Sequence, residues 1–72
     1  MTFVVVNQST DEYVKQKYGD SDFGTDFESL DNACHFAMIA SVEAAGDTIA
    51  VCRKESNGDE TPVRSYCSEP EE

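Results

Sequence analysis

Basic side chains are scarce in this 72-residue chain: five Lys and Arg stand against 15 Asp and Glu, and the formal net charge is −10. Because nucleic acids and anionic membranes attract Lys and Arg, this balance argues against direct binding to either. A membrane-spanning helix needs roughly 18 consecutive apolar residues, and the sequence contains no such run. Residues 1–7 also lack the basic segment and apolar core of a signal peptide, so we expect a cytoplasmic protein.

Paired cysteines and metal-binding motifs are missing too. Cys34, Cys52 and Cys67 form an odd number and contain no C-x-x-C spacing. We interpret them as reduced, partly buried thiols, with a disulfide between two of them as the alternative. Together with His35 they do not have the spacing of a zinc site.

Catalytic motifs are equally lacking. Cys34 and His35 are adjacent on a predicted helix, where neighbouring side chains point about 100° apart, so they do not form a nucleophile and base pair. The sequence has no glycine-rich phosphate loop and no serine nucleophile elbow. We therefore expect a protein that is not an enzyme and needs no cofactor.

Signals for strands and helices are present in the first two thirds of the chain. Residues 2–8 contain three consecutive valines, which is typical of a strand covered on both faces. Ser9 and Glu12 have the spacing of a capping box, which predicts a short helix over about 10–18. Ser29 is placed to cap a second, longer helix over 30–45.

The last third of the chain has the pattern of a β-hairpin. Residues 48–53 alternate as a strand, and Asn57-Gly58 is a strong signal for a type I′ turn. Pro62 indicates that the final strand lies at a sheet edge. This turn predicts the cross-strand pairs Cys52–Val63, Val51–Arg64 and Ile49–Tyr66.

The predicted order is therefore β-α-α-β-β, an α+β fold. We expect one small domain over residues 1–67, with both helices on one face of a small antiparallel sheet. Residues 68–72 form a predicted acidic, flexible tail.

The predicted helix over 30–45 is apolar around most of its circumference. A helix of this kind is usually buried on more than one side. Either the first helix or a second subunit covers its outer face. One alternative function is accordingly a small structural or accessory protein that homodimerises through this helix.

Residues 20–31 resemble the calcium loop of an EF-hand in part. Asp20, Asp22, Glu28 and Asp31 fall at positions 1, 3, 9 and 12 of the twelve-residue motif. Position 5 is a glycine without a side-chain ligand, and position 6 is a threonine where the sharp turn requires glycine. A calcium-binding domain is the less favoured alternative.

Acidic residues gather in two parts of the sequence, one interleaved with aromatic residues before residue 32 and one at the hairpin tip and tail. A solvated surface or an adaptation to high salt explains such a distribution without any partner. The functional interpretation is that the carboxylates imitate a phosphate backbone and occupy a basic groove. The predicted partner-binding residues are Asp20, Asp22, Asp26, Glu28 and Asp31, with Tyr18, Phe23 and Phe27 as aromatic anchors.

A small, acidic, single-domain protein with this order of elements resembles phage-encoded inhibitors of bacterial defence, among them anti-CRISPR proteins and DNA mimics. The resemblance rests on size, charge and the β-α-α-β-β plan over most of the chain. It implies stoichiometric binding to a nucleic-acid-binding effector complex, such as a CRISPR effector, with loss of access for DNA or guide RNA.

Overall fold

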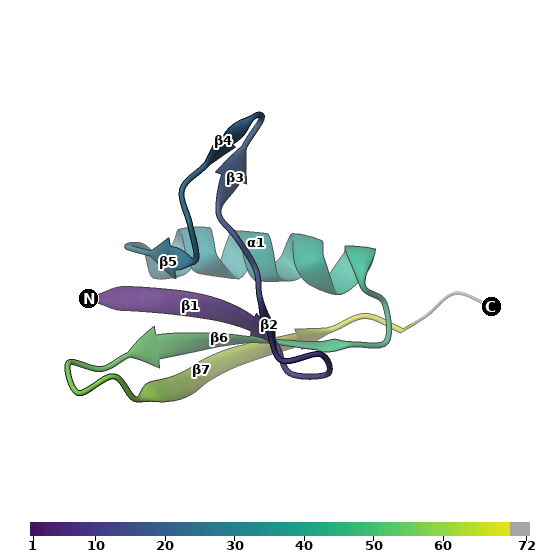
Figure 1. The fold of residues 1–72 in the computed structure, drawn as a ribbon. Coiled ribbons are helices and arrows are strands. Elements are labelled where there is room, and N and C mark those ends of the chain that lie inside the picture. Colours follow the sequence, from purple (N-terminus) through teal and green to yellow (C-terminus); the bar gives the residue numbers. More distant parts are fainter. Residues whose placement is uncertain (70–72) are drawn as a thin grey trace.

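The computed structural model describes residues 1–69 and shows an α+β fold of two layers, with one helix on one face of an antiparallel sheet (Figure 1). The strand order is β2-β1-β6-β7, and β5 also pairs with β1. Two further strands, β3 and β4, form a separate hairpin. The elements are β1 (Thr2–Asn7), β2 (Glu12–Tyr13), β3 (Lys17–Tyr18), β4 (Ser21–Asp22), β5 (Asp26–Phe27), α1 (Leu30–Glu43), β6 (Thr48–Lys54) and β7 (Glu60–Cys67).

The central strands are β1 and β6, which pair from Thr2 opposite Lys54 to Asn7 opposite Ile49. Both faces of this pair are apolar, as the run of valines predicts. One face packs against the small residues Ala33 and Ala37 of α1, which are fully buried and let the helix lie close to the sheet. The residues of this core are Phe3, Val5, Phe27, Ala33, Ala37, Ile49 and Val51.

The helix α1 begins as predicted. The Ser29 side chain accepts a hydrogen bond from the Asn32 amide at 3.4 Å, which satisfies one of the amides left unpaired at a helix start. The helix ends at Glu43 rather than at Ala45, and Gly46 follows in the left-handed region with φ 94°. No helix in the described part of the chain has the length and apolarity to cross a membrane.

The predicted helix over 10–18 is wrong, and the stated order with two helices is wrong with it. This stretch instead contains β2 and β3. The β2 strand turns back along β1, and the Val14 amide extends the pairing by donating to the Val5 carbonyl at 2.8 Å.

A turn that begins at Asn7 explains why the strand forms instead of the helix. The Asn7 carboxamide oxygen accepts hydrogen bonds from the Ser9 and Thr10 amides at 2.9 and 3.2 Å. The Ser9 hydroxyl, which the capping-box pattern assigned to a helix, accepts from the Thr48 amide at 3.3 Å. A contact between residues so distant in sequence has no local signature, so the pattern alone favoured the helix.

The β6–β7 hairpin has the predicted register in its inner half only. Ile49 lies opposite Tyr66 and Val51 opposite Arg64, and β7 is the edge strand expected from Pro62. Between Val51 and Cys52 the register shifts by a β-bulge. Cys52 therefore lies opposite Pro62, and the predicted Cys52–Val63 pair is wrong.

The tip of this hairpin explains the shift. The Glu55 carbonyl accepts from the Gly58 amide at 3.0 Å, and the Glu55 amide donates to the Asp59 carbonyl at 2.7 Å. Gly58 has φ 92°, whereas Asn57 does not have a positive φ, so the turn has three residues rather than the two of a type I′ turn. The extra turn residue displaces the pairing near the tip by one position, so that Cys52 lies opposite Pro62. The bulge restores the predicted pairing from Val51 and Arg64 inwards.

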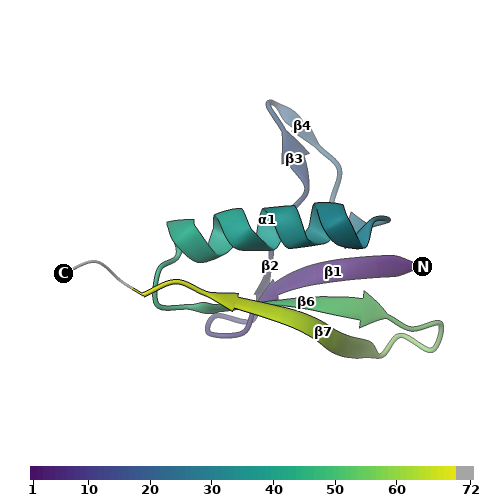
Figure 2. The ribbon, with the colours of Figure 1, turned by 180° about the vertical axis from the view of Figure 1, so that it is seen from behind.

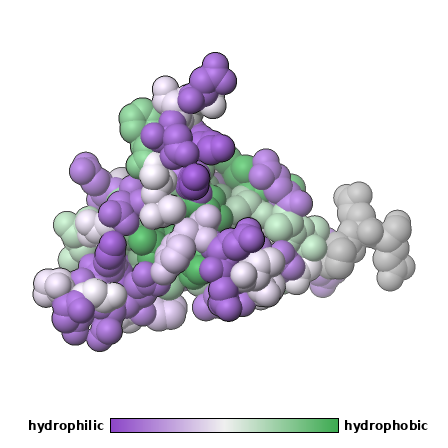
Figure 3. All heavy atoms as spheres, in the orientation of Figure 1, coloured by the Kyte–Doolittle hydropathy of each residue, from purple (hydrophilic) through white to green (hydrophobic). Residues whose placement is uncertain are grey.

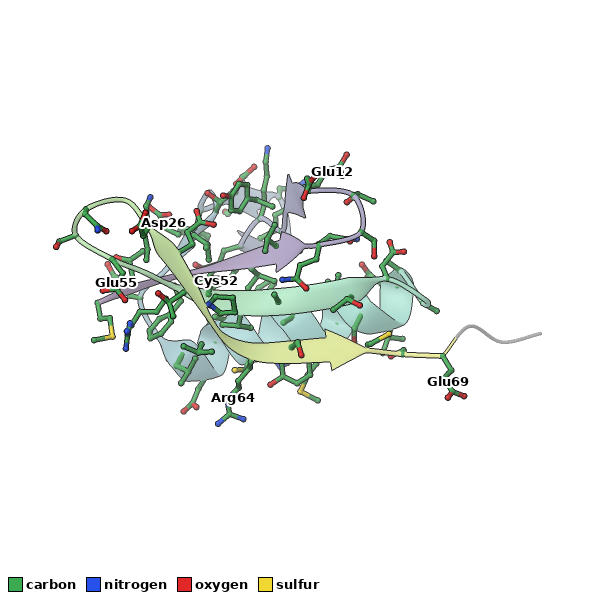
Figure 4. The ribbon with its side chains drawn as sticks, turned by 90° about the horizontal axis from the view of Figure 1, so that it is seen from below. Glu12, Asp26, Cys52, Glu55, Arg64 and Glu69 are labelled. Carbon is green, nitrogen blue, oxygen red and sulfur yellow. The ribbon has the colours of Figure 1, made fainter. Side chains whose placement is uncertain are left out.

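The sheet face away from α1 is covered by the hairpin itself. Bulges increase strand twist, and Figure 4 shows the β6 and β7 ribbons crossing beside Cys52. The Tyr13 hydroxyl of β2 donates to a Glu60 carboxylate oxygen of β7 at 2.7 Å. This bond joins the two outer strands above Val4, Ala50 and Cys52, each at most 3% exposed.

Phe27 and Phe23 allow a matched test of the core. Phe27 is 0% exposed and its ring centroid lies 5.4 Å from that of Phe36, whereas Phe23 is 59% exposed. We expect Phe27→Ala to lower the free energy of unfolding by about 3–5 kcal/mol, which exceeds or equals the stability of most domains of this size. Phe23→Ala should cost less than about 1 kcal/mol.

Denaturant unfolding followed by circular dichroism measures both losses. Phe27→Leu, with an expected loss of about 1.5 kcal/mol, keeps the comparison measurable if Phe27→Ala does not fold. Equal losses for Phe27→Leu and Phe23→Ala would contradict this assignment of the core.

The Tyr13–Glu60 bond predicts a pH dependence of stability. The hydrogen bond to Glu60 raises the pKa of Tyr13 above its ordinary value of 10.0. The folded chain favours protonated Tyr13. The bond therefore contributes fully to the free energy of unfolding below pH 10.0, and this contribution is lost as the pH rises through the raised pKa of Tyr13. Unfolding titrations on both sides of pH 10.0 should show a steeper alkaline loss for the wild type than for Tyr13→Phe. Parallel curves for the two proteins would show that the bond does not contribute.

Candidate interaction surface

A short hairpin, here called the arm and comprising residues 16–24, projects from the two layers. Its base is closed by backbone hydrogen bonds from the Gln16 amide to the Gly24 carbonyl at 2.7 Å and from the Phe23 amide to the Gln16 carbonyl at 2.8 Å. Gly19, with φ 62°, occupies its two-residue turn. Figures 1 and 2 show the arm beside α1, extending past the helix on the side away from the sheet.

Two of the predicted acidic residues lie on this arm. Asp20 is exposed in the turn, and Asp22 lies in β4. The Gly24 amide donates to the Asp22 carboxylate at 2.8 Å and lowers the pKa of that carboxyl, with a smaller effect from Lys15. Lys15 Nζ lies 3.6 Å from an Asp22 carboxylate oxygen. The negative charge of Asp22 is therefore partly balanced by Lys15, whereas Asp20 has no ion pair among residues 1–69.

Acidic residues from two distant parts of the sequence meet at the end of the molecule where β1 begins. Asp26 of β5 lines one hollow with Lys54, Glu55 and Ser56 of the hairpin, and the Lys54 ammonium lies 3.6 Å from an Asp26 carboxylate oxygen. Figure 4 shows Asp26 and Glu55 at this end and Glu69 at the opposite one. We call this region the acidic end; its residues are Asp26, Glu28, Glu55, Asp59 and Glu60.

A second hollow adjoins the acidic end between the arm and the first turn of α1. Phe23, Asp26 and Glu28 line it together with Gln16, Ser29 and Asn32. Phe23, Asp26 and Glu28, which all belong to the predicted site, thus lie close together. Asp31 lies in the first turn of α1 and is exposed.

Two of the predicted aromatic anchors need separate comment. Phe27 is fully buried in the core, so its assignment as a contact residue is wrong: it cannot reach a partner unless the fold opens. Tyr18 belongs to β3, and its side chain lies outside the part of the chain that the structure describes. Phe23 is the remaining anchor with a described exposed ring.

The outer face of α1 carries an exposed apolar surface that is not among the residues predicted for the site. Met38, Ile39 and Val42 on the outer face of α1 are 54%, 42% and 69% exposed. The sequence did carry the signal, because Met38 and Val42 continue a row of residues spaced by four from Leu30. The pattern predicts that this face is covered by the first helix or by a second subunit, and the described residues contain no such helix.

Residues 20–31 do not have the helix–loop–helix arrangement of an EF-hand. An EF-hand loop lies between two helices, whereas residues 20–31 follow β3, contain β4 and β5, and only then enter α1. Within residues 1–69, no three His, Cys, Asp or Glu side chains are grouped so that they could hold a metal ion.

The three cysteines are free thiols in three different environments. Cys34 lies half-buried on α1, where a side-chain hydrogen bond with it raises the pKa of Tyr66. Cys52 lies on the sheet face away from α1, and burial raises the pKa of its thiol. Cys67 is exposed at the end of β7. All three cysteines are free, so the disulfide alternative is not formed here, and within residues 1–69 no group of three metal-ligating side chains includes them.

No family model, curated protein or solved structure matches this chain. The resemblance to phage-encoded inhibitors accordingly stays a prediction.

The different exposures of the thiols predict different reactivities. With a thiol-specific disulfide reagent, Cys67 should react first, whereas buried Cys52 with its raised pKa should react only when the fold opens. Cys67→Ser should remove the fast phase and Cys52→Ala should leave it unchanged. A fast phase that persists in Cys67→Ser would contradict the assignment.

Proposed function

We propose that this protein is a non-enzymatic binding module whose acidic end occupies a basic surface of a partner that otherwise binds nucleic acid. The observation that supports the proposal is the proximity of two acidic segments, residues 26–28 and 55–60, at one end of the fold. Carboxylates that only solubilise the protein have no reason to gather from distant parts of the chain.

The charges left unpaired at this end favour a cationic partner. Three of the five basic residues already bind carboxylates within the chain: Lys15 with Asp22, Arg53 with Glu55 at 2.8 Å, and Lys54 with Asp26. Glu28 and Asp59 make no ion pair among the described residues. Their charge attracts a basic groove over long range and speeds association.

Specific binding also needs apolar contact area from which water is excluded. Phe23 supplies an exposed aromatic ring beside Asp26 and Glu28. The partner class suggested by the resemblance is a nucleic-acid-binding effector complex in the cytoplasm, such as a CRISPR effector. The mechanism is occupancy: while the acidic end fills the groove, a nucleic acid cannot enter it.

A matched pair of variants tests this proposal. Glu28→Gln with Asp59→Asn removes two charges from the acidic end, and Asp11→Asn with Glu12→Gln removes two charges from the β1–β2 turn. In pull-downs from a lysate of the source organism, the wild type and the control should retain a nucleic-acid-binding protein that duplex DNA displaces. The acidic-end variant should lose it, and capture should fall steeply with salt.

Two results would contradict the proposal. One is capture that salt and DNA leave unchanged. The other is an equal loss of capture in both double variants, which would show that total charge rather than the acidic end determines binding.

A further inference from the structure

The outer face of α1 is an apolar strip that no described part of the chain covers. Met38 and Val42 lie four residues apart on this face, with Ile39 beside them, and all three are at least 42% exposed. His35 and Glu43 complete the lining of a shallow groove over these residues. We call this surface the α1 groove; its residues are His35, Met38, Ile39, Val42 and Glu43.

The arm gives the α1 groove a wall. Val14, Lys15 and Lys17, at and before the start of the arm, line a hollow together with Ile39 and Glu43 of the helix. The arm extends past α1 on the side away from the sheet (Figures 1 and 2). Figure 3 shows green, hydrophobic spheres beside the arm, over the part of the molecule that contains α1. The groove therefore has a floor, one wall and an open side.

Carboxylates surround the floor. Asp31 lies on the same helical face, one turn before His35. Glu43 lines the groove near the end of the helix, and Glu69 lines a hollow with Val42 and Ala45 beyond it. None of these three carboxylates makes an ion pair among residues 1–69. The five residues that line the groove include no Lys or Arg. Lys15 and Lys17 line the neighbouring hollow, and Lys15 is paired with Asp22.

We propose that the α1 groove binds an amphipathic helix of the partner, with apolar residues on one face and Lys or Arg along its flanks. This inference rests on the proposed function and names the structural element that the partner presents. The apolar face of such a helix covers Met38, Ile39 and Val42, and its cations lie against Asp31, Glu43 and Glu69. Charge argues against a second copy of this chain, because it brings the same carboxylates and another net charge of −10 to the contact.

A synthetic helical peptide with leucines at heptad spacing and lysines at the other positions is a suitable probe. A second peptide has the same composition in scrambled order, with equal charge but no apolar face. In a fluorescence anisotropy titration of the full-length protein, we expect the amphipathic peptide to bind at least about tenfold more tightly than the scrambled one.

Two valine variants locate the contact. Val42→Asp places a charge on the floor, and Val63→Asp makes the same change on β7, where Val63 is 40% exposed. Val42→Asp should weaken binding of the amphipathic peptide about tenfold, while Val63→Asp should change it little. Amide shifts in NMR spectra should concentrate in residues 35–43, and circular dichroism checks that each variant is folded.

Equal affinity for the two peptides, or equal effects of the two valine variants, would overturn the inference. Self-association of the protein that Val42→Asp abolishes would also overturn it, because a second copy would then be the occupant. Any of these three results leaves the acidic end to be judged separately, since the test with Glu28 and Asp59 does not involve the α1 groove.

Discussion

The antiparallel pairing of β1 with β6 is the constraint on which the rest of this structure depends. In so short a chain, two strands alone cannot bury both of their faces, yet Val4, Val5, Ala50 and Val51 are all at most 2% exposed. Helix α1 covers one face and the twisted β6–β7 hairpin covers the other. The small side chains at the contacts, Ala33 and Ala37 on the helix and Ala50 on the sheet, make this possible because they let backbones approach closely. The large apolar side chains beside the pair are used in this way, whereas Met38, Ile39 and Val42 on the outer face of α1 remain exposed.

This division explains where the candidate site can lie. Within the described residues, the sheet face away from α1 is closed, since the bond between Tyr13 and Glu60 joins the outer strands above Val4, Ala50 and Cys52. The exposed surfaces considered for the site are the acidic end, the arm and the outer face of α1. These surfaces adjoin at the first turn of α1, where Glu28, Ser29 and Asn32 share a hollow with Phe23. Charge and apolar area thus occupy neighbouring surfaces, and one partner can contact both.

The sequence predicted those elements whose signals are local. The Ser29 cap, the start of α1 and the edge position of β7 follow from patterns within a few residues. The inner register of the hairpin agrees with the prediction only because the bulge offsets the three-residue turn. The prediction of a helix over residues 10–18 was wrong because the capping-box pattern competes with a turn that is stabilised by Asn7 and by the Ser9–Thr48 hydrogen bond. For the candidate site, exposure was the missing quantity. Phe23 and Phe27 have similar acidic neighbours in sequence, yet pairing of Phe27 with Phe3 of β1 places only Phe27 in the core.

The two irregularities of the β6–β7 hairpin have a consequence for how this protein can change over generations. The three-residue turn displaces the strands by one position and the bulge at Val63 restores them, so residues 54–62 are uncoupled from the alignment of Val51 with Arg64 and Ile49 with Tyr66. Substitutions near the tip therefore do not have to preserve the fit beneath α1. The hairpin tip can therefore change exposed carboxylates such as Asp59 while the core stays the same, whereas Glu60 is held by the hydrogen bond from Tyr13.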